Sequence, residues 1–108
     1  MLKSEKTIVA TPNGDVYENI LGNSGMAKGG SGDVLAGCIT SFTGQNIVRA
    51  QKSEDANYDA ILKGVLTGVY IHSLSGDMAC YDKGEDGMTP SDIIDNIPYA
   101  VKYIKSTN

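Results

Sequence analysis

The chain has 108 residues, enough for one small domain with a modest core. Nine basic residues stand against thirteen acidic ones, and the formal charge of −4 includes no basic cluster, so we expect no nucleic-acid partner. No apolar run approaches the roughly 18 residues that a membrane span needs, and residues 1–6 carry no apolar signal region, so we expect no membrane partner.

The two cysteines, Cys38 and Cys80, follow no spacing typical of disulfides or metal sites. Cys38 falls on the apolar face of a predicted helix, where a free thiol behaves as a small hydrophobic group. A disulfide or a metal role is the minor alternative. Together with the absence of a signal region, this cysteine usage indicates a reducing cytoplasm.

The first predicted elements are two short strands. Thr7–Ala10 and Val16–Asn19 are strand-like runs, and residues 11–15 between them contain the proline, asparagine and glycine of a tight turn. This spacing predicts a β-hairpin. A glycine-rich loop is expected over residues 20–30.

The first helix is predicted over residues 32–42. Gly44 is expected to end this helix, and residues 45–55 are expected to form a polar connection with some frayed helix. One apolar stripe at helical spacing supports the helix: Val34, Leu35, Cys38, Ile39 and Phe42.

A long helix is predicted over residues 55–81, and it carries a row of small residues four apart. Glycine within a helix costs about 1 kcal/mol relative to alanine, so close packing of another helix or of a ligand is the expected compensation. The row also includes the only histidine, which we expect to be packed or hydrogen-bonded rather than catalytic. Its members are Ala56, Ala60, Gly64, Gly68, His72 and Gly76.

The last helix has a clear predicted start. Thr89 is expected as the N-cap, Pro90 as the first helical residue and Asp92 as a capping acid, while Pro98 should kink or restart the helix. Residues 82–87 before it form an acidic loop in this prediction, and they lack the ligand pattern of a calcium site. Asp77 is interpreted as a solvated or capping acid.

Residues 22–37, which read GNSGMAKGGSGDVLAG, are the most informative segment. Unpaired N–H groups at a helix start favour anions, and glycine allows the backbone to approach a phosphate closely. The segment fits neither the P-loop nor the dinucleotide fingerprint, and its glycines alone are more often a structural turn. Asp33 changes this balance, because an acid among such amides suits a base that deprotonates a hydroxyl attacking a phosphoryl group. The alternative is a carboxylate that merely complements the helix dipole.

This segment resembles the signature of the ADP/ATP-dependent NAD(P)H-hydrate dehydratases, which are carbohydrate-kinase-like members of the ribokinase superfamily. Ser4 and Lys28 depart from that pattern, which usually has glycine and threonine there. The further matches lie at residues 2–7, 68–72 with 75–77, 88–94 and 97–98.

The resemblance implies an α/β fold of the ribokinase-like three-layer αβα type. In this interpretation residues 1–108 are a single partial domain, a β-hairpin and about three helices from the C-terminal part of the parent fold. Apolar faces that the missing layers normally cover would then be exposed, so we expect self-association into a homo-oligomer.

The resemblance also implies the reaction and its residues. ADP or ATP phosphorylates the ring hydroxyl of hydrated NADH or NADPH, and phosphate then leaves, with Asp33 as the catalytic base in contact with the substrate. Mg²⁺ should accompany the nucleotide, although we identify no ligand set for it in the sequence. The implied phosphate-binding residues are Gly29, Gly30, Ser31 and Gly32. The implied adenylate-binding residues are Lys3, Ser4, Glu5, Lys6 and Thr7, for which a frayed strand start is the equal alternative.

Two other functions stay open. One is a small-molecule kinase of the thiazole or pyrimidine type, against which the GMA-x-GG stretch argues. The other is a non-catalytic piece that binds nucleotide weakly or only self-associates. The preference for ADP or for ATP is not encoded in any residue that we can identify.

Overall fold

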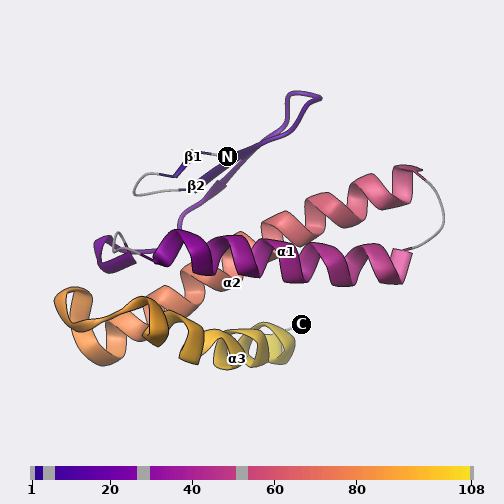
Figure 1. Ribbon diagram of the computed structural model, residues 1–108. Coiled ribbons are helices and arrows are strands. Elements are labelled where there is room, and N and C mark those ends of the chain that lie inside the picture. The colour runs from indigo at the N-terminus through magenta and orange to yellow at the C-terminus, as the bar shows by residue number, and fades with distance from the viewer. Residues whose placement is uncertain (1, 4–6, 27–29, 51–53, 108) are drawn as a thin grey trace.

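The computed structural model describes residues 2–3, 7–26, 30–50 and 54–107 (Figure 1). A small sheet lies on one side of α1, and α2 packs against both α1 and α3. The elements are β1 (Leu2–Lys3), β2 (Thr7–Ala10), β3 (Val16–Asn19), the 3₁₀ helix η1 (Ser24–Met26), α1 (Ser31–Ala50), α2 (Glu54–Gly87) and α3 (Pro90–Thr107).

The predicted hairpin is confirmed. β2 and β3 pair antiparallel with Thr7 opposite Asn19, and Gly14 turns the chain with a φ of 92°. The Thr11 hydroxyl accepts the N–H of Asp15 at 3.1 Å and closes the loop. β1 was not predicted as a paired strand, but it pairs antiparallel with β2, so β2 is the central strand of a three-stranded sheet.

α1 is longer than predicted. Gly44 does not end the helix, which continues to Ala50, so the expected polar connection over residues 45–50 is wrong. Glycine ends a helix mainly when it adopts a positive φ, and Gly44 is not among the glycines that do. Beyond it, the Asn46 amide donates to the Ala60 carbonyl of α2 at 3.3 Å, so tertiary packing outweighs the weak local stop signal.

α2 is also longer than predicted, since it reaches Gly87 instead of ending at Tyr81. The expected acidic loop over residues 82–87 is therefore mostly helical. Gly84, with φ 78° and ψ 164°, is its one non-helical residue and kinks the helix. The loop prediction located the break in the helix but overestimated its length, because a single glycine with a positive φ is enough to kink the helix.

The small-residue row of α2 is where α1 approaches, as predicted. A Cβ on Gly68 would lie 2.7 Å from the Ile39 Cα and 2.8 Å from the Ile39 nitrogen. A Cβ on Gly64 would collide with the backbone of Thr43, which also belongs to α1. The two helices therefore touch backbone to backbone, and the glycines are required by α1 rather than by a ligand.

The predicted start of α3 is confirmed in detail. The Thr89 hydroxyl accepts the N–H of Asp92 at 3.3 Å, and the Asp92 carboxylate accepts the N–H of Thr89 at 2.8 Å. This reciprocal pair is a capping box built with aspartate. α3 continues through Pro98 to Thr107, so the predicted restart does not occur. The carbonyl that Pro98 cannot bond belongs to Ile94, so α3 continues with one helical hydrogen bond missing.

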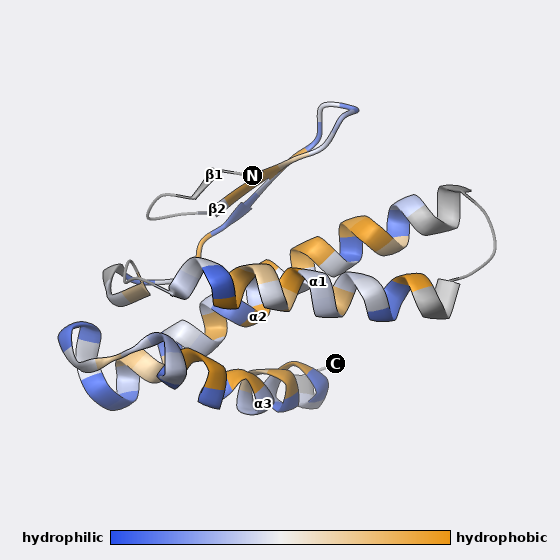
Figure 2. Cartoon of the chain, viewed as in Figure 1, coloured by the Kyte–Doolittle hydropathy of each residue, from blue (hydrophilic) through white to orange (hydrophobic). Residues whose placement is uncertain are grey.

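Two clusters of buried side chains form the core. Figure 2 shows apolar residues gathered where the sheet, α1, α2 and α3 face one another. One cluster joins β2, α1 and α2 through Val9, Leu35 and Val69. The other joins η1, α2 and α3 through Met26, Ala79, Met88 and Ile93.

These elements are compatible with part of a carbohydrate-kinase-like fold, while the three-layer parent arrangement stays a prediction. Among the described helices, none combines the length and the apolarity that crossing a bilayer would take.

The close approach at Gly68 predicts opposite effects for the same substitution at two helical glycines. Gly68→Ala should destabilise the chain by about 1–3 kcal/mol, because the backbone of Ile39 cannot yield. Gly44→Ala is the matched control: nothing lies within 4 Å of its added Cβ, so it should stabilise α1 by about 0.5–1 kcal/mol. Urea unfolding followed by circular dichroism measures both. Equal stabilisation by the two changes would contradict the backbone contact.

The Asp92 carboxylate predicts an acid-sensitive junction between α2 and α3. A hydrogen bond from Lys83 at 2.8 Å, and next the N–H of Thr89, hold the pKa of Asp92 below its usual range. Because the folded-state pKa is the lower one, this stabilisation is present above the unfolded value of about 4 and is lost as the pH falls through the folded value.

Asp92→Asn should therefore be less stable than wild type at neutral pH, and the difference should shrink on acidification. Urea midpoints measured from neutral pH downward test this. Asp95→Asn, which removes an exposed carboxylate from the same helix, is the control and should show a smaller gap at neutral pH. A gap for Asp92→Asn that stays constant with pH would rule out the ionised pair as its cause.

Candidate functional site

The candidate site is built around the first turn of α1. Gly30 has a φ of 96°, and its carbonyl accepts the N–H of Val34 at 3.2 Å, so Gly30 is the N-cap. The amides of Gly30, Ser31, Gly32 and Asp33 consequently have no acceptor within the helix. A Cβ on Gly30 would also lie 3.3 Å from the Pro90 side chain, so α3 supports this turn from behind.

Ser31 and His72 fix the turn from the side of α2. Ser31 is 1% exposed and His72 is 2% exposed. The His72 Nε2 lies 3.1 Å from the Ser31 carbonyl oxygen and 3.5 Å from the Ser31 hydroxyl oxygen. The prediction of a hydrogen-bonded helix histidine is confirmed. Its partner, the first residue of the candidate site, could not be read from the sequence.

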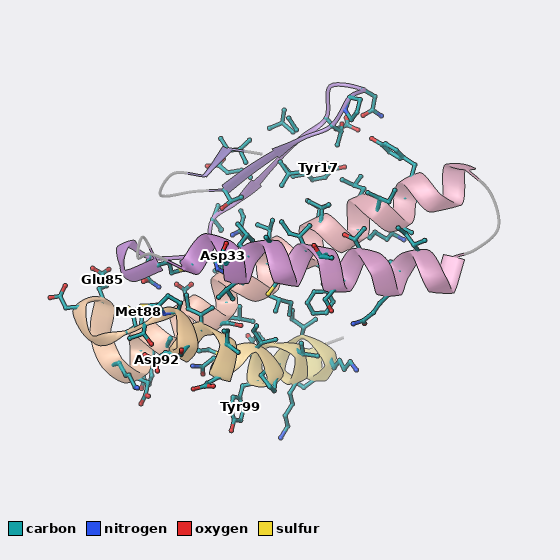
Figure 3. The ribbon with its side chains drawn as sticks, in the orientation of Figure 1. Tyr17, Asp33, Glu85, Met88, Asp92 and Tyr99 are labelled. Carbon is teal, nitrogen blue, oxygen red and sulfur yellow. The ribbon has the colours of Figure 1, made fainter. Side chains whose placement is uncertain are left out.

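Asp33 and Gly32 lie on the other side of the same turn. Both are exposed, and an added Cβ on Gly32 would meet nothing within 4 Å. Figure 3 shows Asp33 close to the start of α1. The structure therefore brings Gly30, Ser31, Gly32 and Asp33 into one turn, with Ser31 inside and the acid outside. Gly29 lies outside the described residues.

A largely apolar cavity of about 430 Å³ begins at Asp33 and follows α1 toward α3. This volume is in the range of small-molecule sites. Cys38 lines the cavity as a buried free thiol, and burial raises its pKa, so it stays a neutral, weakly nucleophilic group. The lining residues are Asp33, Val34, Gly37, Cys38, Ser41, Phe42, Ile94 and Ile97.

The first half of the glycine-rich segment has a structural role that sequence reasoning missed. The Asn23 amide donates to Asp77 at 2.9 Å and to the Gly76 carbonyl at 3.2 Å, and the Gly22 N–H donates to Asp77 at 3.2 Å. The interpretation of Asp77 as a solvated or capping acid is therefore wrong, because this carboxylate anchors the loop.

Two further glycines complete this anchor, Gly25 in the glycine-rich segment and Gly76 in α2. Gly25 packs so closely that its Cβ would lie 2.7 Å from the Glu85 carbonyl oxygen, and a Cβ on Gly76 would collide with Met26. Figure 3 shows Met88, which also contacts Gly25, at the junction of α2 and α3. In the sequence, the signal for the contact between Gly76 and Met26 was that the row of small residues in α2 extends as far as Gly76.

The predicted adenylate segment is described only at its ends. Lys3 lies in β1 opposite Thr7, and Thr7 is buried opposite Asn19. The Asn19 amide donates to the hydroxyl of Ser73, the neighbour of His72, so the end of this hairpin reaches the turn of α2 that holds Ser31. Ser4, Glu5 and Lys6 lie outside the described residues.

Magnesium finds no ligand set in the described part of the chain. No group of three or more histidine, cysteine, aspartate or glutamate residues there is arranged to hold a metal ion. We therefore derive no chemical step through a metal ion held by these side chains alone.

A helix start whose first amides have no acceptor within the helix is typical of sites that bind anionic groups. Comparison with known proteins specifies the class. Residues 1–99 match the carbohydrate-kinase family described as NAD(P)H-hydrate dehydratase. The chain belongs to this family. No solved structure matches it.

Three relatives illustrate the extent of the match. The chain is 35% identical over 105 residues to a bifunctional NAD(P)H-hydrate repair enzyme of Thermofilum pendens, covering 97% of the chain and 18% of that protein. A protein of the same description from Moorella thermoacetica is 34% identical over the same shares. An ADP-dependent (S)-NAD(P)H-hydrate dehydratase of Staphylococcus aureus is 36% identical over 90 residues, 83% of the chain and 28% of that protein. The chain thus spans less than a third of each relative.

The positive φ of Gly30 and its contact with Pro90 generate a prediction with a matched control. Gly30→Ala and Gly14→Ala each place a side chain at a φ above 90°, which should cost about 1–2 kcal/mol in either case. Only Gly30→Ala should also shift the amide resonances of Ser31, Gly32 and Asp33 in a ¹⁵N correlation spectrum. The geometry given for this turn is wrong if Gly14→Ala moves those resonances equally.

Proposed function

We propose that this chain carries the phosphoryl-transfer centre of an NAD(P)H-hydrate dehydratase that uses ADP or ATP. The observation that supports it best is the first turn of α1, where amides that have no acceptor within the helix stand next to the exposed Asp33, and Asp33 lines a cavity of about 430 Å³. A phosphoryl group beside the amides and a hydroxyl beside the acid are the two reactants that such a turn can bring together.

In the first step Asp33 takes the proton of the hydroxyl on the hydrated nicotinamide ring. The resulting oxygen attacks the terminal phosphorus of the nucleotide, a new P–O bond forms, and the bond to the departing nucleotide oxygen breaks. The amides of Gly29, Gly30, Ser31 and Gly32 hold the charge on the transferring group, as an oxyanion hole does. Since the helix start carries partial positive charge, this stabilisation is built into the backbone.

In the second step phosphate leaves the ring with the electrons of the C–O bond. The neighbouring ring carbon loses a proton to water, the double bond re-forms, and reduced NADH or NADPH results. Phosphorylation thus converts a poor leaving group into a good one. The overall reaction consumes one phosphoryl bond for each repaired cofactor.

The nucleotide lies, in this proposal, between the hairpin end and the first turn of α1. Lys3, Ser4, Glu5, Lys6 and Thr7 are the proposed adenylate contacts. Thr7 pairs with Asn19, and the Asn19 amide donates to Ser73. Ser73 is next to His72, which is hydrogen-bonded to Ser31. This series of contacts connects the strand end to the first turn of α1 and supports the placement.

The same proposal makes residues 1–108 part of a larger ribokinase-like domain. The chain matches less than a third of its relatives, and large apolar side chains such as Ile20 and Tyr81 are 77% and 95% exposed. Such side chains are covered in a larger domain or in a homo-oligomer. Light scattering measures whether the isolated chain is a monomer or a homo-oligomer, and it therefore distinguishes these two ways of covering the side chains.

The test begins with calorimetric titration of the chain with ADP and with ATP in the presence of magnesium. Wild type and Asp33→Asn should bind nucleotide with similar affinity, because the acid serves the reaction rather than binding. Regeneration of NADH from its hydrate should fall about 10²–10⁴-fold in Asp33→Asn. Asp59→Asn removes an exposed charge elsewhere in the chain and should leave both measurements unchanged.

Each alternative gives a different result in this assay. No heat with either nucleotide would contradict a nucleotide site in this chain. Phosphorylated substrate that accumulates without release of NADH would identify a small-molecule kinase instead. Equal turnover by Asp33→Asn and wild type would remove Asp33 from the mechanism.

A further inference from the structure

We propose that His72 is a positioning residue that aims the Gly32 amide out of the first turn of α1. The hydrogen bond to Ser31 is the observation that carries this inference. That the aimed amide serves phosphoryl transfer rests on the function proposed above, whereas the positioning itself does not.

The geometry determines which atom donates. A carbonyl oxygen can only accept, so at 3.1 Å the His72 Nε2 carries the hydrogen and the Ser31 carbonyl receives it. In a regular helix the same carbonyl accepts the N–H four residues on, and it has a second lone pair for the imidazole. Because both residues are at most 2% exposed, water does not compete for this bond.

The Ser31 carbonyl and the Gly32 N–H belong to one planar peptide unit. They point in opposite directions across that plane. When His72 holds the oxygen, the Gly32 N–H is therefore held in the opposite direction, out of the start of α1, and Gly32 itself is exposed. Donation to the carbonyl also polarises the peptide unit and strengthens its N–H as a donor.

The turn needs such an external anchor because of its composition. Gly30 and Gly32 flank Ser31, and glycine restricts the backbone least of all residues. Pro90 lies close to Gly30 on one side, and His72 is hydrogen-bonded to Ser31 on another. Without the imidazole, the Ser31 carbonyl would be held only by its helical hydrogen bond to the N–H of Leu35, and the peptide plane between Ser31 and Gly32 would be less firmly fixed.

The first measurement uses the wild-type chain without any ligand. His72 is the only histidine, so its imidazole gives a single set of ¹⁵N signals. We expect a protonated Nε2 whose hydrogen exchanges slowly with water. A neutral imidazole protonated on Nδ1 alone would overturn the proposal, and this result requires no variant to fold.

The second measurement compares two substitutions. His72→Leu removes the donor, whereas His72→Gln retains an amide N–H at the reach of Nε2. The Gly32 amide resonance should shift and its hydrogen exchange should change in His72→Leu, and His72→Gln should restore most of both. Ser75→Ala is the control, because it removes a fully buried hydroxyl of α2 that has no hydrogen-bond partner among the described residues, and it should leave Gly32 unchanged.

Titration with ADP separates positioning from function. ADP binding should weaken about tenfold in His72→Leu and recover in His72→Gln. If wild type binds no ADP, the proposed function fails while the Gly32 resonances still decide the role of His72. If Gly32 is unaffected in a folded His72→Leu, or if His72→Gln fails to restore it, His72 is only a packing residue.

Discussion

The backbone contact between α1 and α2 is the constraint on which the rest of the structure depends. Gly64 meets Thr43 and Gly68 meets Ile39, and no side chain fits between the helices at either point. One turn further along the same row, His72 meets Ser31, and then Gly76 meets Met26. The two glycines thus set the register that places the imidazole under the start of α1. A shift of either helix would bury Ser31 against a different residue.

This register also explains how one helix serves as a template for an irregular loop. The described residues of this loop and its two ends, 19–26 and 30–31, include one short helical turn, η1, so their shape comes mainly from contacts with α2. Three side chains of α2 bond to this stretch: Ser73 to Asn19, Asp77 to Asn23 and His72 to Ser31. Gly76 leaves room for Met26. Gly76 weakens α2 by about 1 kcal/mol relative to alanine and is tolerated, because a side chain at this position would push Met26 and its loop away.

The features that sequence predicts well are those fixed by local chemistry. The hairpin turn, the capping box of Thr89 and Asp92, and the packing row of α2 each depend on neighbouring residues or on a simple period. The extension of α1 past Gly44 and the anchoring by Asp77 depend on contacts with distant parts of the chain. Such contacts outweigh local preference, and no pattern of neighbours encodes them.

The candidate site shows the same division. The glycine-rich segment pointed to Gly30, Ser31, Gly32 and Asp33, and the structure places these four residues in one helical turn. Its first half was interpreted together with them, yet Asn23, Gly25 and Met26 hold the loop to α2 and α3 instead. The sequence could not separate the two halves, because both consist of small residues whose purpose depends on what lies opposite.

The orientation of Asp33 follows from the burial of Ser31. Successive helical residues are about 100° apart around the axis, so two residues apart point to nearly opposite sides. Once His72 draws Ser31 against α2, Asp33 must face away from α2, and it does so at the mouth of the cavity toward α3. Gly32 lies between them and exposes its backbone without a side chain to cover it. One buried hydrogen bond therefore sets the directions of both the acid and the amide, and helix geometry transmits it.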